Sequence, residues 1–216
     1  IRNSARRLRT ATEDELTEGV LERLDGFLEL GTTTIEAKSG YGLSTESELA
    51  SLRAIRRADE SHPLDLVPTF LGAHEVPDEY RQDREAYISI LMDEMLPAVA
   101  QEGLAEACDV FCEEHVFSVD ESRRILLRAK ELGMAVKLHA DEIRPIGGAE
   151  LAAELGALSA DHLVAISDEG IRRMRDARVV PILLPATSLY LNLGHDAPGK
   201  RMLAEGLPCA IATDFN

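Results

Sequence analysis

Short apolar runs alternate along this chain with longer stretches in which apolar residues recur at helical spacing. Each short run ends in a cluster of polar residues, as strands that lead into loops do. The runs that predict strands cover residues 32–37, 65–72, 107–113, 135–139, 157–162, 179–184 and 210–214. Units of about thirty residues with this alternation indicate parallel strands joined by right-handed helical crossovers.

The intervening stretches predict helices over residues 45–60, 118–133, 147–156, 167–178 and 200–206. A further long helix is predicted that contains Tyr87, Ile90, Leu91, Met95 and Leu96. The helix over 118–133 has the clearest ends. Ser118 offers an N-cap oxygen, Glu121 completes a capping box, and Gly133 ends the helix. The strands therefore alternate with helices along the whole chain.

Two α/β architectures fit this order, an open doubly wound sheet and a closed eight-stranded barrel. The chain has no GxGxxG after its first strand and no GxxxxGK[ST]. Neither usual nucleotide-binding motif therefore favours the open sheet. Polar residues instead stand at the carboxyl ends of different strands, where a (β/α)8 barrel assembles its active site: Lys38, His74, Glu113, His139, His162, Pro185 and Asp214. The count of about seven strands is one short of a closed barrel. No linker divides the chain, so residues 1–216 are expected to form one partial barrel domain.

Composition narrows the classes of function. Apolar residues make up 45% of 216 residues, which is enough to fill a core. The formal charge of −16, from 39 acidic and 23 basic residues, would repel nucleic acid. The apolar runs fall far short of the roughly 20 residues that span a bilayer. The first residues contain no apolar signal-peptide core, so a cytoplasmic location is expected.

Several cysteines and histidines are expected to have no catalytic role. An odd number of cysteines in a large chain indicates reduced thiols rather than disulfides, and these are Cys108, Cys112 and Cys209. The histidines in loops, His62, His115 and His195, are interpreted as surface residues rather than ligands.

Candidate chemistry lies at the strand ends of the second half. His139 precedes Glu142 by three residues, which suits a metal ligand beside a proton-transfer group. His162 and Asp214 end two further strands. A buried carboxylate at Asp214 would need a cation or another positive partner. The alternatives at this stage are hydrogen-bonded core histidines and, for Asp214, a helix N-cap or a structural ion pair.

The first half offers substrate-binding candidates. His74 ends a strand and would face the same barrel mouth. Lys38 and Tyr41 lie on a Gly-rich loop whose exposed amides and phenol would hold a small polar ring, unless its glycines only make a tight turn. No GxSxG elbow or catalytic cysteine context favours a covalent nucleophile.

A family resemblance rests on six segments that occur in order along most of the chain: TTTIEAKSGYGL, TFLGAHEVPDEY, CDVFCEE, VKLHADE, GGAELAAELGALSADHL and IATDFN. The chain resembles the imidazolonepropionase family of the amidohydrolase superfamily. HADE, SADH and TDFN are typical of amidohydrolases in looser form, whereas KSGYGL with FLGAH is specific to this family. The resemblance implies an α/β fold, an incomplete amidohydrolase-type TIM (β/α)8 barrel.

The resemblance also implies metal-dependent hydrolysis of the cyclic amide of 4-imidazolone-5-propanoate to N-formimidoyl-L-glutamate, in histidine degradation. His139 and Asp214 would be ligands of one zinc or iron ion. His162 would contact the attacking water or the intermediate, and Asp214 would share in handling its proton. Glu142 would hydrogen-bond a ring nitrogen of the substrate and shuttle a proton.

Further residues are assigned to substrate binding by the same resemblance. Tyr41 and His74 would contact the imidazolone ring and its side chain, and Asn216 would hold the substrate carboxylate. Arg6 and Arg9 occupy positions similar to arginines of the family. The implied partner is a small-molecule substrate, with a homodimer possible and with neither nucleic acid nor membrane involved.

The chain departs from the family because it contains no HxH, the pair of metal ligands on the family's first strand. We therefore expect a fragment that lacks the first strand and the C-terminus. With two protein ligands in place of four, it would be inactive and nearly metal-free. Two other readings stay open: an aminohydrolase of a purine or pyrimidine, and a noncatalytic αβ binding protein with a degenerate pocket.

Overall fold

Seven strands follow one another through one sheet in the order of the chain, in a computed structural model that describes residues 2–215. The pairs β1–β2, β4–β5, β5–β6 and β6–β7 are parallel. The strands are β1 (Thr34–Lys38), β2 (Asp65–Ala73), β3 (Ala107–Cys112), β4 (Ala135–Ala140), β5 (Ser159–His162), β6 (Val180–Leu183) and β7 (Ala210–Ile211). The strands predicted from the sequence are confirmed, although β7 is shorter than the predicted 210–214.

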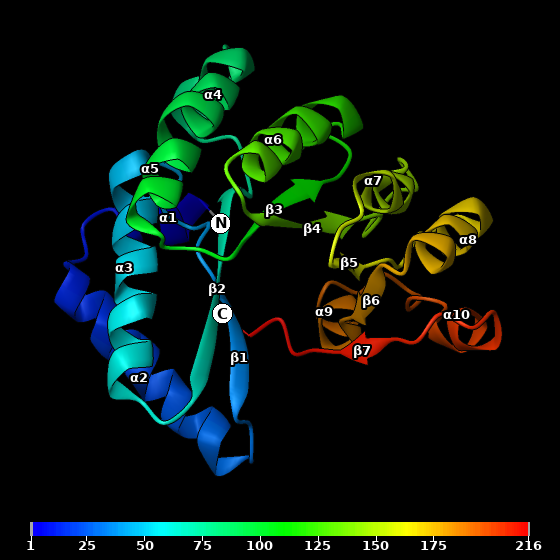
Figure 1. Cartoon of the computed structure of the whole chain (residues 1–216), viewed down its shortest axis with the longest axis horizontal. Coiled ribbons are helices and arrows are strands. Elements are labelled where there is room, and N and C mark those ends of the chain that lie inside the picture. Colours follow the sequence, from blue (N-terminus) through cyan, green and yellow to red (C-terminus); the bar gives the residue numbers. More distant parts are fainter. Residues whose placement is uncertain (1, 216) are drawn as a thin grey trace. The chain divides into compact units, whose positions relative to one another are not determined.

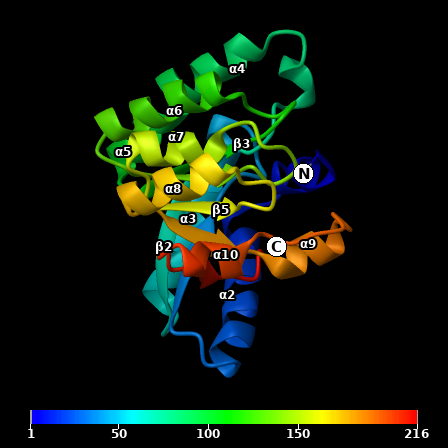
Figure 2. The same cartoon turned by 90° about the vertical axis from the view of Figure 1, so that its right-hand side faces the viewer.

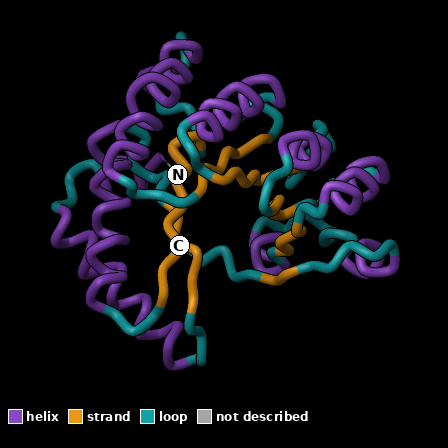
Figure 3. The backbone as a smooth tube through the Cα atoms, in the orientation of Figure 1, coloured by secondary structure: helices purple, strands orange, loops and turns teal. Residues whose placement is uncertain are grey.

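Helices connect successive strands, as the alternation predicts (Figure 3). They are α1 (Arg2–Leu8), α2 (Glu13–Glu29), α3 (Thr45–Ser61), α4 (Arg84–Ile90), α5 (Leu96–Glu102), α6 (Val119–Glu131), α7 (Gly148–Leu155), α8 (Asp168–Ala177), α9 (Pro185–Tyr190) and α10 (Gly199–Ala204), with the 3₁₀ turn η1 (Asp78–Tyr80) and the π-helical turn η2 (Leu91–Met95). The stretch from Tyr87 to Leu96, predicted as part of one helix, is α4, η2 and the start of α5 in succession. Helices α1, α2 and α9 were not predicted.

The chain divides into two compact units. The first runs to Cys108 and includes Arg128–Met134, whereas the second comprises Asp109–Leu127 and the residues from Ala135 onward. The expectation of one domain stays a prediction.

In the first unit, β1 and β2 pair in register from Thr34 opposite Asp65 to Lys38 opposite Thr69. Helix α3 packs on β2, and α2 packs along α3 (Figure 1). Leu52 and Ala58 of α3 are fully buried in this contact layer. Burial of apolar area of this kind supplies about 25 cal/mol per Å². The first unit therefore has its own core.

In the second unit, α7 lies against β4 and β5 with α8 beside it (Figure 2). The close approach depends on a glycine, because a Cβ at Gly148 would lie 2.9 Å from Cβ of Ala140. The register between β4 and β5 sets His139 opposite Asp161 and Ala140 opposite His162. Side chains of directly paired residues share one face of a sheet, so this register already decides which polar groups meet.

Two sequence-based expectations concern the chain as a whole. Cys108, Cys112 and Cys209 are all free thiols, as predicted, and burial raises the pKa of Cys112 to about 11. Among the helices of residues 2–215, none has both the length and the apolar character that crossing a membrane requires.

The predicted capping box opens α6. The backbone N–H of Glu121 donates to Oγ of Ser118 at 3.3 Å, and the N–H of Ser118 donates to Oε2 of Glu121 at 2.8 Å. Both groups would otherwise lack an intrahelical partner. The cap fixes where α6 begins after β3.

Replacing Ser118 by alanine should therefore lower the free energy of unfolding by about 1 kcal/mol. Denaturant unfolding followed by circular dichroism measures this change. Ser4→Ala, at an exposed position in α1, is the matched control and should leave the unfolding midpoint nearly unchanged. Equal midpoints for Ser118→Ala and the unchanged chain would contradict the capping role.

Candidate functional site

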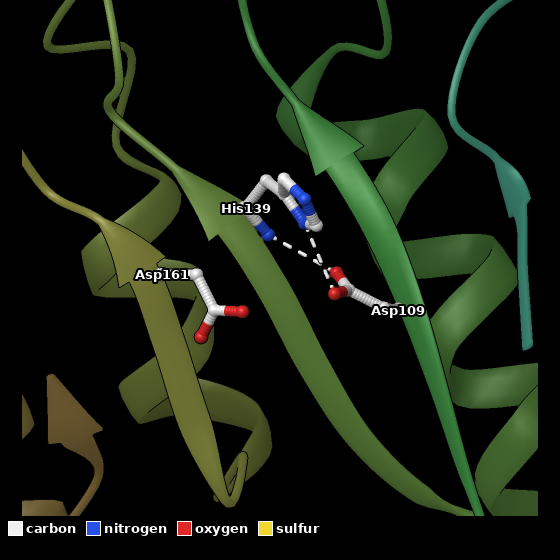
Figure 4. Close-up of side chains that lie close together, drawn as sticks. All are labelled: Asp109, His139 and Asp161. Carbon is white, nitrogen blue, oxygen red and sulfur yellow. Dashed lines mark hydrogen bonds and ion pairs between the residues drawn. The ribbon is translucent and has the colours of Figure 1, made fainter. Parts of the chain in front are cut away.

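The candidate site of the second unit is built around His139, the residue before the last one of β4. Asp109 on β3 and Asp161 on β5 flank it, so three neighbouring strands each contribute one buried polar side chain (Figure 4). Their possible ligand atoms all lie within 4.8 Å of one another. Within residues 2–215, this is the cluster whose donors could hold a metal ion.

Asp109 orients His139 through both of its carboxylate oxygens. Oδ1 accepts the backbone N–H of His139 at 3.1 Å, and Oδ2 lies 3.0 Å from Nδ1 of the ring (Figure 4). Nδ1 and Oδ2 do not meet in hydrogen-bond geometry, but an anionic oxygen at this distance favours a proton on the nitrogen that faces it, so we infer that the ring proton is on Nδ1. In this tautomer Nε2 is the lone-pair nitrogen, which is the form of histidine that a metal requires.

The donor types fit a divalent ion. An imidazole and carboxylates are common ligands of zinc and iron. Since Asp109 already holds His139 in place, we interpret it as the partner behind the ligand rather than as a ligand itself. Neither Asp109 nor Asp161 was predicted from the sequence to be a site residue. The signal was available in CDVFCE, where the acidic Asp109 and Glu113 share one face of the strand and Cys108, Val110 and Cys112 lie on the other.

His162 joins the cluster through an unusual backbone conformation. As the residue after Asp161 it would point to the opposite face of a regular strand, but its φ is 72° and that of Leu163 is 58°. Left-handed conformations of such residues are rare and cluster at functional sites. The ring centroid of His162 lies 5.1 Å from that of His139, and Nδ1 lies 3.4 Å from Oε1 of Glu142.

Glu142 is held in place by its neighbours in the loop. Asp141 accepts the N–H groups of Gly147, Gly148 and Ala149 at the start of α7. On the other side, Oε2 of Glu113 accepts the N–H of Ile143 at 2.8 Å. Anchors on both sides fix the backbone that carries Glu142.

The surroundings of Glu142 change its protonation. Its side chain is buried, and burial raises its pKa to about 7. The positive charge of a protonated His139 would oppose the rise, whereas the charges of Asp214 and Glu113 add to it. A carboxyl group that titrates near neutral pH can both accept and deliver a proton.

Asp214 differs from its prediction in one respect. From the sequence, Asp214 was expected to be a buried carboxylate that needs a positive partner. It is instead exposed, and its Oδ2 accepts a hydrogen bond from Oγ1 of Thr187 at 2.9 Å. β7 ends at Ile211, so Asp214 lies in the following segment, with a φ of 54°. Its charge nevertheless reaches Glu142.

The substrate-binding candidates of the first unit also lie together. The rings of Tyr41 and His74 meet edge to face with centroids 4.9 Å apart. The prediction of exposed loop amides was wrong, because the N–H groups of Gly42 and Leu43 donate to the buried Glu48. Nζ of Lys38 lies 3.6 Å from Oε1 of Glu36.

The remaining predicted residues have different outcomes. His115 and His195 are exposed, as expected. The side chain of His62 is only 7% exposed and its Nε2 lies 3.3 Å from Oδ1 of Asp25, so its interpretation as a surface residue was wrong. Asn216 lies outside the described residues, and Arg6 is exposed on α1.

Comparison with known proteins identifies the family. No family model matches the chain. The chain is 56% identical to the imidazolonepropionase of Clostridium tetani over 99% of its residues, and 54% and 49% identical to those of Symbiobacterium thermophilum and Alkaliphilus metalliredigens over all of them. The chain belongs to the imidazolonepropionase family. It spans about half (51%) of the length of these relatives.

Solved structures agree on the fold. The 5-methylcytosine deaminase of Klebsiella pneumoniae matches 97% of this imidazolonepropionase-family chain and 55% of its own, with a TM-score of 0.76 at 15% identity. The adenine deaminase of Arthrobacter aurescens matches 94% of this chain and 63% of its own, with a TM-score of 0.70 at 17% identity. At such identities the likeness shows the fold alone. The expected incomplete amidohydrolase-type (β/α)8 barrel is confirmed, whereas the roles of single residues stay predictions.

The contact between Asp109 and His139 predicts a change of tautomer in an Asp109→Asn chain. The new amide oxygen would still accept the hydrogen bond from the backbone N–H of His139. The amide NH₂ group would then face Nδ1 and could only donate to it. The ring proton should therefore move to Nε2. Nitrogen NMR of the metal-free chain would then show that Nδ1 is the unprotonated nitrogen and Nε2 the protonated one. Zinc affinity in an enzyme of the relatives' full length should fall about 10–100-fold.

Asp120→Asn, at an exposed position of α6, is the matched control and should change neither measurement. An unchanged tautomer in Asp109→Asn would show that Asp109 does not orient His139.

The raised pKa of Glu142 predicts a pH-dependent stability. Because the folded value of about 7 lies above the usual 4.5, the folded chain binds the extra proton between these pH values and loses stability as the pH rises through them. The Glu142→Gln chain should not share this loss. In metal-free protein, its free energy of unfolding relative to the unchanged chain should therefore rise by about 1–2 kcal/mol from pH 5 to pH 8. Denaturant unfolding at each pH measures this difference.

Glu114→Gln, on a side chain 49% exposed, is the control and should show no such growth. A constant difference between Glu142→Gln and the unchanged chain across this range would argue against a raised pKa.

Proposed function

We propose that the protein containing this chain hydrolyses the cyclic amide of 4-imidazolone-5-propanoate and releases N-formimidoyl-L-glutamate. The observation that carries this proposal is the 49–56% identity to imidazolonepropionases along essentially the whole chain. The grouping of His139, His162 and Glu142 adds chemical support, because an imidazole pair beside a carboxyl group suits hydrolysis of an amide.

In this proposal, His139 and Asp214 contribute ligands to one divalent ion, zinc or iron. Such an ion, when bound, acidifies a water molecule and polarises the carbonyl group under attack. Asp109 keeps Nε2 of His139 in the unprotonated form that binding needs. The remaining steps belong to the side chains of the protein.

His162 and Asp214 take up the proton of the attacking water. The water oxygen forms a bond to the ring carbonyl carbon, and the bond from this carbon to the ring nitrogen breaks. Glu142 delivers a proton to the departing nitrogen. The 3.4 Å separation between Nδ1 of His162 and Oε1 of Glu142 gives these two groups a short path for proton exchange. Tyr41 and His74 contact the imidazolone ring and its side chain, and Asn216 holds the carboxylate.

A second candidate, the deamination of a purine or pyrimidine, has one observation in its favour. Solved deaminases share the fold, but at 15–17% identity they say nothing about the substrate. Incubation with imidazolone propanoate, cytosine and adenine separates the two functions. Ring opening without ammonia release supports the proposal, and ammonia release from a nucleobase alone would refute it. A cytoplasmic location and a homodimer stay predictions.

The role of Glu142 in proton delivery predicts the effect of its replacement. In an enzyme of the relatives' full length, Glu142→Gln should lower kcat by about 10²–10⁴-fold, the usual contribution of a general acid. Metal content should not change, because Glu142 is not among the proposed ligands. Turnover with the imidazolone substrate and metal analysis of the same sample measure both effects.

Glu114→Gln is the control for loss of a nearby surface carboxylate. Unchanged turnover in Glu142→Gln would remove Glu142 from the role of proton donor.

A further inference from the structure

Two side chains bind all four backbone polar groups of Gly42 and Leu43 in the loop after β1. Arg9 donates from Nε to the carbonyl oxygen of Gly42 at 2.7 Å and from Nη2 to that of Leu43 at 2.9 Å. Oε1 of Glu48 accepts the N–H of Gly42 and that of Leu43, both at 2.8 Å. Arg9 and Glu48 therefore hold the same two residues from opposite sides, and we call this arrangement the loop clamp.

The backbone of this loop needs such support. Leu43 has a φ of 55°, a left-handed conformation that costs about 1 kcal/mol or more outside glycine. A Cβ at Gly42 would lie 2.5 Å from Cβ of Ser47, so the chain passes too close to α3 for any other residue. A strained and closely packed backbone persists only where its surroundings determine it.

The two clamp residues differ in their surroundings. Glu48 is completely buried at the start of α3, and burial raises the pKa of its carboxyl group, while the hydrogen bonds that it accepts oppose this rise. Arg9 is 31% exposed at its side chain and also donates from Nη1 to Oε1 of Glu79 at 2.8 Å. Hydrogen bonds from a guanidinium group are stronger than those between neutral groups.

The clamped residues follow directly after Tyr41. The rings of His74 and Tyr41 meet edge to face, and Nδ1 of His74 lies 3.0 Å from the carbonyl oxygen of Gly40. Since a carbonyl only accepts, Nδ1 carries the proton and Nε2 is the acceptor of this ring. The same loop thus carries Tyr41 and, through the carbonyl group of Gly40, sets the tautomer of His74.

We propose that Arg9 and Glu48 are positioning residues, which hold the loop 39–43 so that Tyr41 and His74 present a preformed surface to the ring and side chain of the substrate. The part that concerns the substrate rests on the proposed function. Neither residue touches the substrate in this proposal; both act through the backbone of Gly42 and Leu43. Their loss should therefore weaken substrate binding more than it slows the chemical step.

The first measurement needs no activity. Amide hydrogen exchange in the 216-residue chain reports directly on the N–H groups of Gly42 and Leu43. Arg9→Met and Glu48→Ala should each speed this exchange about tenfold or more. Glu48→Gln keeps an acceptor oxygen at the same place and should restore slow exchange. Arg53→Met, which removes an arginine of α3 that is paired with Glu102, is the matched control and should leave the loop unchanged.

The second measurement is kinetic, in an enzyme of the relatives' full length that contains these residues. Arg9→Met should raise KM for imidazolone propanoate about tenfold or more while kcat changes much less, and Arg53→Met should change neither. Because Arg9 is partly exposed, its replacement should leave the fold intact even if Glu48→Ala fails to fold.

The outcomes distinguish the clamp from the proposed function. Unchanged exchange at Gly42 and Leu43 in Arg9→Met would overturn the clamp. Faster exchange with an unchanged KM, or equal losses in kcat and kcat/KM, would overturn the positioning role. If the unmodified enzyme does not open the imidazolone ring, the proposed function fails, yet faster exchange in Arg9→Met would still support the clamp.

Discussion

The hydrogen-bonded contact between Asp109 and His139 determines the rest of the candidate site. Asp109 is fully buried on β3, and a carboxylate in such a place is tolerated only when its oxygens are engaged. Both oxygens meet His139, one at the backbone and one at the ring. The ring of His139 lies near those of His162 and Phe111, with centroid distances of 5.1 Å and 5.6 Å. A metal-binding histidine needs this fixed direction because its lone pair must point at the ion.

Buried carboxyl groups in this chain accept hydrogen bonds from the backbone N–H groups of loops. Loops at the carboxyl ends of parallel strands carry N–H groups that have no partner in the sheet, and such groups are costly to bury unpaired. Asp141 satisfies three of them at the start of α7, Glu113 one at Ile143, and Glu48 those of Gly42 and Leu43. Part of the acidic excess of this chain is thus structural. The loops that carry Glu142 and Tyr41 are held by the same chemical device.

The success of the sequence analysis differs with the range of the interactions involved. Strands and the capping box of α6 follow from neighbours in sequence, and both were predicted correctly. The loop after β1 was interpreted as a set of exposed amides because nothing in KSGYGL says that Glu48, on the next helix, accepts them. His62 was placed on the surface because its contact with Asp25 joins residues 37 positions apart. Errors thus concentrate where a polar group finds its partner far along the chain.

The sequence by itself determined the alternation of strands and helices, the family, and the polar residues at strand ends, because periodicity and local motifs encode these features. It named His139, Glu142 and His162 but missed Asp109 and Asp161. Only the tertiary structure decided that the register sets Asp161 opposite His139, and that a left-handed backbone turns His162 towards it. The register and the left-handed conformation at His162 both depend on contacts between strands that are far apart in the sequence. No local pattern of residues carries that information.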